Sequence, residues 1–185
     1  MRKSTFRFFL LFGFIVFLFT QCNVLAPISS EESGSHTNKP GTTQPKPPKM
    51  DKEALLRADI LDYAKEYLGT EYKYAGRDPK KGFDCSGFTY FVMLAHEIIL
   101  SPSSRAQENQ GKRISVKDVQ AGDLIFYRRS ANTDVFHVSL VVSNTSEGIK
   151  VIHSTSRGVV IDNISTSSYW NPKISTARDV VSGKF

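Results

Sequence analysis

The residue best suited to nucleophilic chemistry is the cysteine at position 85. Cys85 lies in the middle of residues 82–88, which are Gly-Phe-Asp-Cys-Ser-Gly-Phe. Residues 76–82 include two glycines and a proline, as is typical of a loop, whereas apolar residues recur at helical spacing after Cys85. We therefore predict that Cys85 stands at a helix N-terminus, where free N–H groups and the helix dipole favour the reactive thiolate. A lone free cysteine is otherwise commonly an inert core residue, so the prediction depends on its partners.

Two of the four histidines could serve as those partners. A cysteine nucleophile needs a base within hydrogen-bonding reach and a third group that orients the base. His137 begins an apolar predicted strand and His153 ends the next one, so a hairpin would bring the two rings side by side. His36 falls in a polar segment, and His96 follows Cys85 by 11 residues, about 16 Å along a helix. We expect His96 to be a surface or interface residue.

The same three residues allow other interpretations. Either histidine alone could be a half-buried side chain with a structural hydrogen bond. Cysteine and histidine are also zinc ligands. The C-x₂-C and H-E-x-x-H spacings that usually mark zinc sites are absent from the sequence. We therefore expect neither a metal nor a cofactor, and favour nucleophilic catalysis by Cys85.

Residues 1–21 have the composition of a signal peptide. Three basic residues and no acid accompany an uninterrupted apolar run at residues 8–19. These twelve residues are too few to span a bilayer, which needs about 20. The sequence therefore predicts export, with the mature protein beginning near residue 22.

Cys22 follows this apolar segment directly, and the arrangement resembles a bacterial lipoprotein signal. The resemblance implies that Cys22 becomes the lipid-bearing first residue and anchors the protein to a membrane. Gln21 departs from the Gly, Ala or Ser usual before such a cysteine. An ordinary signal peptide, or an uncleaved anchor with Cys22 incidental, is the alternative. If Cys22 carries lipid, Cys85 is the only thiol of the mature protein, and an unpaired exported thiol calls for a functional reason.

The remainder of the chain divides into a linker and one domain. Residues 22–50 form the predicted tether, because they are rich in Ser, Thr, Pro, Gly, Lys and Glu. The domain, residues 51–185, opens with a helix that Asp51 would cap, with an apolar stripe ending near Gly69. From about residue 118 the pattern changes to short β-rich runs separated by turns. Helices followed by a meander of strands predict an α+β fold, with N-terminal helices packed on an antiparallel sheet.

The charge of the chain does not indicate a nucleic-acid partner. The formal net charge is +6, but three of the 24 Lys and Arg residues lie in the predicted signal peptide. The remaining 21 basic residues face 18 acidic ones, and no basic cluster interleaved with aromatics stands out. We expect no nucleic-acid binding and a monomeric protein.

Five segments of the sequence match the NlpC-type cell-wall cysteine peptidases in order and spacing. They are residues 68–76, 82–88, 122–126, 137–142 and 151–156. The chain therefore resembles this family over residues 55–183, including closing Tyr169-Trp170 and Ala177-Arg178 elements. The resemblance implies a compact papain-like fold.

The resemblance also implies roles for individual residues. Cys85 would attack a peptide carbonyl, His137 would act as base and then acid, and His153 would hold the His137 ring in one tautomer. Tyr72 would help to stabilise the oxyanion together with backbone N–H groups at the start of the helix.

The implied substrate is the peptidoglycan stem peptide, cut between γ-D-glutamate and a diamino acid, with Asp84 and Ser86 contacting its polar groups. Ala75 stands where the family motif usually has glycine, and residues 23–50 are too short for an added wall-binding domain. A non-catalytic peptidoglycan-binding module, or an amidase or acyltransferase on the same fold, is the alternative function.

Overall fold

The structure is a computed structural model that describes residues 51–184. The predicted signal peptide, Cys22 and the linker lie outside the described residues. Within residues 51–184 there is no helix long and apolar enough to cross a membrane.

The first helix, α1 (Lys52–Lys65), begins where the capping pattern predicts. The Asp51 carboxylate accepts a hydrogen bond from the Glu53 N–H at 3.1 Å, and Ile60 is fully buried beneath the helix. The helix ends at Lys65, earlier than the apolar stripe predicted, and Gly69 lies in the following turn with a φ of +83°. An L-residue rarely adopts this left-handed conformation, which explains why glycine stands there.

A short hairpin leads into the second helix. Strands β1 (Arg77–Asp78) and β2 (Gly82–Phe83) pair antiparallel, and α2 (Cys85–Ala95) starts two residues after β2 ends. One face of α2 is apolar and fully buried, with Phe88 and Val92 packed against the sheet. This burial fixes the direction of α2, and therefore the position of its first residue, Cys85.

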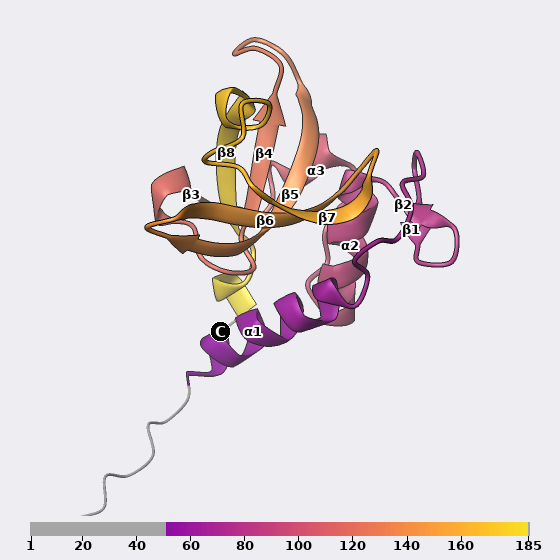
Figure 1. Cartoon of the computed structure of the whole chain (residues 1–185). Helices are drawn as coiled ribbons and strands as arrows, with labels where there is room; N and C mark the ends of the chain where they lie inside the picture. The colour runs from indigo at the N-terminus through magenta and orange to yellow at the C-terminus, as the bar shows by residue number, and fades with distance from the viewer. Residues whose placement is uncertain (1–50, 185) are drawn as a thin grey trace, which may run out of the picture. The chain divides into compact units, whose positions relative to one another are not determined.

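A six-stranded antiparallel sheet forms the centre of the domain (Figure 1). Its order is β3-β8-β4-β5-β6-β7, so β4 to β7 form the predicted meander, while β8 and β3 extend the other edge. The strands are β3 (Lys112–Ile114), β4 (Leu124–Arg128), β5 (Val135–Thr145), β6 (Gly148–Thr155), β7 (Gly158–Asn163) and β8 (Ile174–Asp179). The shorter elements are α3 (Ser104–Gln107) and the 3₁₀ turns η1 (Val116–Asp118), η2 (Asn171–Lys173) and η3 (Ser182–Lys184). The predicted α+β class is confirmed.

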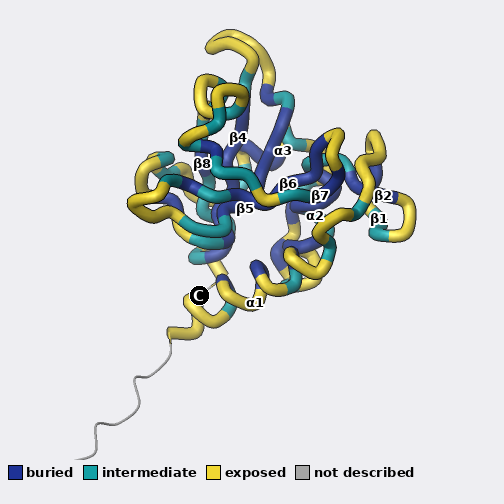
Figure 2. The backbone as a smooth tube through the Cα atoms, viewed as in Figure 1, coloured by how far each residue is buried: buried dark blue, intermediate teal, exposed yellow. Residues whose placement is uncertain are grey.

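Apolar side chains bury both faces of this sheet. One cluster joins α1 and α2 to the sheet and includes Phe88, Phe126 and Ile152. The other includes Tyr127 and Val151, with Trp170 packed against it. Figure 2 shows the result: the central strands are buried, whereas the loops at their ends are mostly exposed. The sheet is thus a rigid support for side chains at its strand ends.

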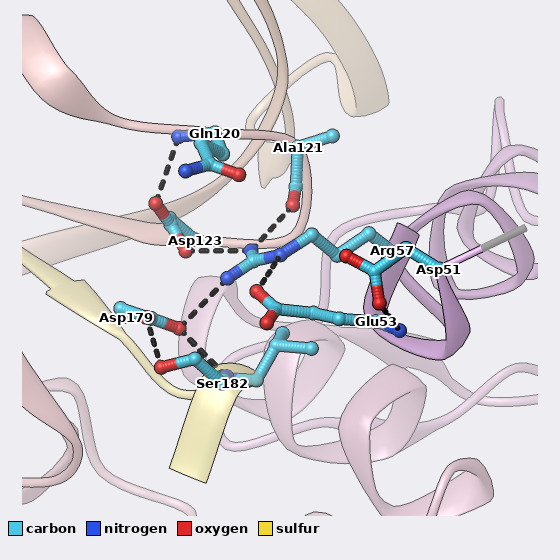
Figure 3. A network of polar contacts seen from close by, with 9 residues as sticks. Asp51, Glu53, Arg57, Gln120, Ala121, Asp123, Asp179 and Ser182 are labelled. Carbon is cyan, nitrogen blue, oxygen red and sulfur yellow. Dashed lines mark hydrogen bonds and ion pairs between the residues drawn. The ribbon is translucent and has the colours of Figure 1, made fainter. Parts of the chain in front are cut away.

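A buried arginine ties α1 to the sheet (Figure 3). Arg57 is 6% exposed, and its guanidinium contacts the carboxylates of Glu53 and Asp123 at 2.8 Å each and that of Asp179 at 2.9 Å. It also donates to the carbonyl of Ala121 at 2.7 Å. The buried guanidinium is thus paired with carboxylates and a carbonyl oxygen from three parts of the chain. These contacts fix where α1 lies relative to the beginning of β4 and the end of β8.

Candidate active site

Cys85 is the first residue of α2, as the sequence predicts. Asp84 caps the helix, since its Oδ1 atom accepts a hydrogen bond from the Gly87 N–H at 2.6 Å. The hydroxyl of Ser86 lies 3.1 Å from the same oxygen and 3.0 Å from the carbonyl oxygen of Pro102. Asp84 and Ser86 therefore shape the turn that presents the thiol.

His137 and His153 lie together on neighbouring strands. They come from β5 and β6, and Nε2 of His137 lies 3.0 Å from Nδ1 of His153. His137 is 6% exposed and His153 is fully buried. Leu140 is paired with Ile152 in the ladder, so the two histidines are diagonal rather than directly opposite neighbours. The two rings therefore lie side by side, as the sequence predicts.

The thiol of Cys85 reaches the same strand. The backbone N–H groups of Val138, next to His137, and of Ser86 act on the thiol in the direction that lowers its pKa. Cys85 and His137 line one pocket of about 740 Å³. The structure thus brings together a thiol, a ring that can accept its proton and backbone donors that can stabilise negative charge.

Burial determines the resting protonation of this group. Loss of solvent around Cys85 raises the pKa of its thiol to about 11, although the N–H groups of Val138 and Ser86 act in the opposite direction. Burial, together with the neighbouring His153, lowers the pKa of His137 well below its usual value. The N–H groups at the helix N-terminus thus favour the thiolate as predicted, but burial outweighs them and the resting thiol keeps its proton. At neutral pH the thiol and the imidazole are both neutral, and the proton must move during attack.

Tyr72 lies in the same pocket. The backbone of Tyr72 forms an isolated β-bridge with that of Phe83. The residue is 43% exposed and lines the pocket together with Cys85. Partial burial raises its pKa, and the nearby Cys85 and Asp84 add to this effect. Its hydroxyl therefore keeps its proton and can donate a hydrogen bond. Tyr74, by contrast, is 85% exposed.

The pocket also contains residues that sequence reasoning did not assign to the site. Asp162 on β7 accepts hydrogen bonds from His153 Nε2 at 3.0 Å and from Trp170 Nε1 at 3.2 Å. Arg129 and Arg157 bring positive charge to the wall of the pocket. Apart from the Tyr-Trp pair of the resemblance, the sequence carries no local signal for these residues. Neither Asp84 nor Ser86 is among the residues that line the pocket.

His96 lies between α1 and α2, away from the pocket. Its side chain is 7% exposed, with Nδ1 2.9 Å from the carbonyl oxygen of Val92, Nε2 3.3 Å from Asp59 and the ring against Tyr63. Of the two expected positions, surface or interface, the structure shows an interface, because α1 packs over the end of α2. Among residues 51–184, no group of three or more His, Cys, Asp or Glu side chains is arranged to hold a metal ion.

Comparison with known proteins gives a consistent match. The sequence profile described as the NlpC/P60 family matches residues 69–179. The chain is 33% identical to the gamma-DL-glutamyl hydrolase of Bacillus subtilis (strain 168) over 72% of its own length, but it spans only 33% of that longer protein. It is 30% identical to the murein DD-endopeptidase MepS/murein LD-carboxypeptidase of Escherichia coli (strain K12), over 80% of this chain and 76% of that protein.

Solved structures agree with these sequence matches. The NlpC/P60 family protein from Bacillus cereus ATCC 10987 superposes with a TM-score of 0.62 at 29% identity, over 68% of this chain and 40% of that chain. The NlpC/p60 domain of the peptidoglycan hydrolase SagA superposes with a TM-score of 0.56 at 30% identity, over 66% of this chain and 97% of that domain.

Proposed function

Because this chain belongs to the NlpC/P60 family, we propose that it is a cysteine peptidase that hydrolyses the stem peptides of peptidoglycan. Its fold is the α+β, papain-like fold of that family. The observation that carries the proposal is that Cys85, at the start of α2, and His137 line one pocket, while the buried His153 bonds to His137 from behind it.

The geometry supports a general-base mechanism. The Cys85 sulfur attacks the carbonyl carbon of the scissile bond while its proton passes to His137 through Nδ1, the ring nitrogen not bonded to His153. The carbonyl electrons move to the oxygen, where backbone N–H groups at the start of α2 and the hydroxyl of Tyr72 stabilise the negative charge.

Breakdown of this intermediate regenerates the carbonyl. The carbon–nitrogen bond breaks, and His137 returns the proton to the leaving amine. Water then attacks the thioester with His137 again as base, and the acid product leaves with Cys85 restored as a thiol. His153 holds the His137 ring throughout. The cycle begins and ends with a neutral thiol and a neutral His137 ring, in agreement with the direction of their pKa shifts, and the ring is positively charged only between accepting a proton and returning it.

The scissile bond is proposed to be the one between γ-D-glutamate and the diamino acid. The relative from Bacillus subtilis is a gamma-DL-glutamyl hydrolase, which supports this bond. Arg129 and Arg157 in the pocket wall suit a substrate that carries free carboxylates, as stem peptides do. Cleavage of the cross-link between two stem peptides is the second candidate, because the Escherichia coli relative is a murein DD-endopeptidase.

Mass spectrometry of muropeptides distinguishes these bonds. Purified sacculi and defined cross-linked muropeptide dimers are incubated with the protein, and the products are compared with those of Cys85→Ala. Fragments that begin with the diamino acid support the γ-glutamyl bond. Conversion of dimers to intact monomers supports cross-link cleavage. Binding without any product from the parent protein would instead favour the non-catalytic module.

The proposal includes an exported, membrane-anchored protein. The signal-like residues 1–21 and the position of Cys22 support a lipid anchor, and residues 23–50 have the composition of a linker. About 28 linker residues reach roughly 90 Å when fully extended, and about 30 Å as a coil. Such a tether would hold the enzyme near the cell wall. Incorporation of a labelled fatty acid, lost in Cys22→Ser, tests the anchor.

A further inference from the structure

One carboxylate oxygen gathers three donors behind the histidine pair. Oδ2 of Asp162 accepts hydrogen bonds from His153 Nε2 at 3.0 Å, from Arg157 at 2.5 Å and from Trp170 Nε1 at 3.2 Å. The Asp162 side chain is 19% exposed, so these contacts are only partly open to solvent. Such a concentration of donors on one atom indicates an ionised carboxylate, which can only accept hydrogen bonds.

The charge of Asp162 determines where the proton of His153 lies. Burial opposes ionisation, but the bonds from His153 and Arg157 outweigh it and hold the pKa of Asp162 below its usual value. Since the carboxylate accepts, Nε2 of His153 must carry a hydrogen. Burial lowers the pKa of His153, so the ring is neutral and its Nδ1 atom has a lone pair instead of a proton.

The same argument extends to His137. Nδ1 of His153 lies 3.0 Å from Nε2 of His137, and a hydrogen bond there requires His137 to be the donor. The neutral His137 ring then carries its hydrogen on Nε2 and has its lone pair on Nδ1. That lone pair is what a general base needs in order to accept the thiol proton.

We propose that Asp162 is a positioning residue that fixes the tautomers of both histidines and so keeps His137 competent as the base. The inference rests on the proposed function for its catalytic consequence, but the tautomers themselves do not depend on any substrate. Without the carboxylate, His153 is free to carry its hydrogen on Nδ1. His137 must then place its own hydrogen on Nδ1, where it blocks acceptance of the thiol proton.

Trp170 contacts both histidine rings as well as Asp162. Its ring stacks on that of His137, with centroids 4.6 Å apart and planes 25° from parallel, and lies 5.0 Å from the ring of His153. Its N–H reaches Asp162 as well. Trp170 therefore holds the planes of the rings while Asp162 sets their protons, and both come from segments that follow the histidines in the chain.

The first test needs no variant and no substrate. Nitrogen-15 NMR of the substrate-free protein at neutral pH, with labelled histidine, distinguishes protonated from bare ring nitrogens. We expect Nε2–H on both His137 and His153. A hydrogen on Nδ1 of either ring would overturn the proposal. Because this measurement is independent of hydrolysis, its failure is separate from a failure of the proposed function.

The second test links the tautomers to turnover. Asp162→Leu keeps a similar volume but removes the acceptor, and we expect kcat to fall at least about tenfold, with Nδ1–H signals appearing on the rings. Arg157→Gln removes the ion pair with Asp162 while leaving its bond to His153, so both rings should keep Nε2–H. If Asp162→Leu leaves the tautomers unchanged, or alters them without lowering kcat, Asp162 does not position the base.

Discussion

A Cβ atom built at Gly87 would lie 1.9 Å from the carbonyl oxygen of Gly76. The loop before β1 thus passes directly over the first turn of α2, two residues after Cys85. Gly87→Ala must displace this loop or the helix, so we expect a loss of about 1–3 kcal/mol in the free energy of unfolding and a large loss of turnover. Urea unfolding and muropeptide release measure the two effects. Gly183→Ala is the matched control, since its Cβ atom would have no neighbour within 4 Å. An active, fully stable Gly87→Ala protein would contradict the tight contact.

The proposed catalytic roles predict how much turnover each active-site variant retains. Cys85→Ala should fold normally and release no muropeptides, because the nucleophile is gone. His137→Ala should also abolish turnover. His153→Gln should retain part of it, since an amide can still hold the His137 ring through its bond to Nε2. Full activity of His137→Ala and His153→Gln alike would favour a packing role for both rings.

The lowered histidine pKa values predict the acidic side of the pH profile. His137 works as a base only when neutral, and its pKa lies well below 6.5. We therefore expect kcat/KM to stay level through pH 6.5 and to decline only at lower pH, as the free enzyme gains a proton on this ring. A decline centred at pH 6.5 or above would indicate a solvent-exposed base instead.

The same shifts predict how stability depends on pH. The folded-state pKa values of His137 and His153 are both lowered, so below pH 6.5 the unfolded chain binds more protons than the folded one. Stability should therefore fall as pH decreases from 6.5 toward the folded pKa values, by up to about 1.4 kcal/mol per pH unit for each ring. Urea unfolding at a series of pH values measures this slope. The variant His137→Gln, His153→Gln should lose it.

Arg57 supports the domain through its buried charge. Arg57→Met preserves volume but leaves the carboxylates of Asp123 and Asp179 without their partner, which costs about 3–5 kcal/mol. Denaturant unfolding measures the loss. Lys65→Gln, which breaks the exposed pair with Asp62, should change stability by less than about 1 kcal/mol. Similar effects of the two substitutions would mean that burial of the Arg57 network contributes nothing.

Some features of this protein follow from its sequence alone. Cys85 at the start of a helix was predictable because the loop residues before it and the helical periodicity after it are both local signals. The placement of His137 beside His153 was predictable because a hairpin pairs strands that are adjacent in the chain. The departure of Ala75 from the family glycine was also visible, and Ala75 has a φ of +55°, in the left-handed region that favours glycine.

Tertiary structure alone decided the remaining features. Asp162 and Trp170 meet the histidines because β7 and the segment after it return to the same pocket, and Arg157 reaches Asp162 from the turn before β7. Nothing in the local sequence of these residues marks the contacts. Arg57 lies on a helix whose apolar stripe gave no sign that a charge would be buried within it. The resting state of Cys85 was decided by tertiary structure for the same reason. The dipole of a helix is a local property, whereas desolvation depends on every segment packed around the thiol, and here desolvation is the larger effect.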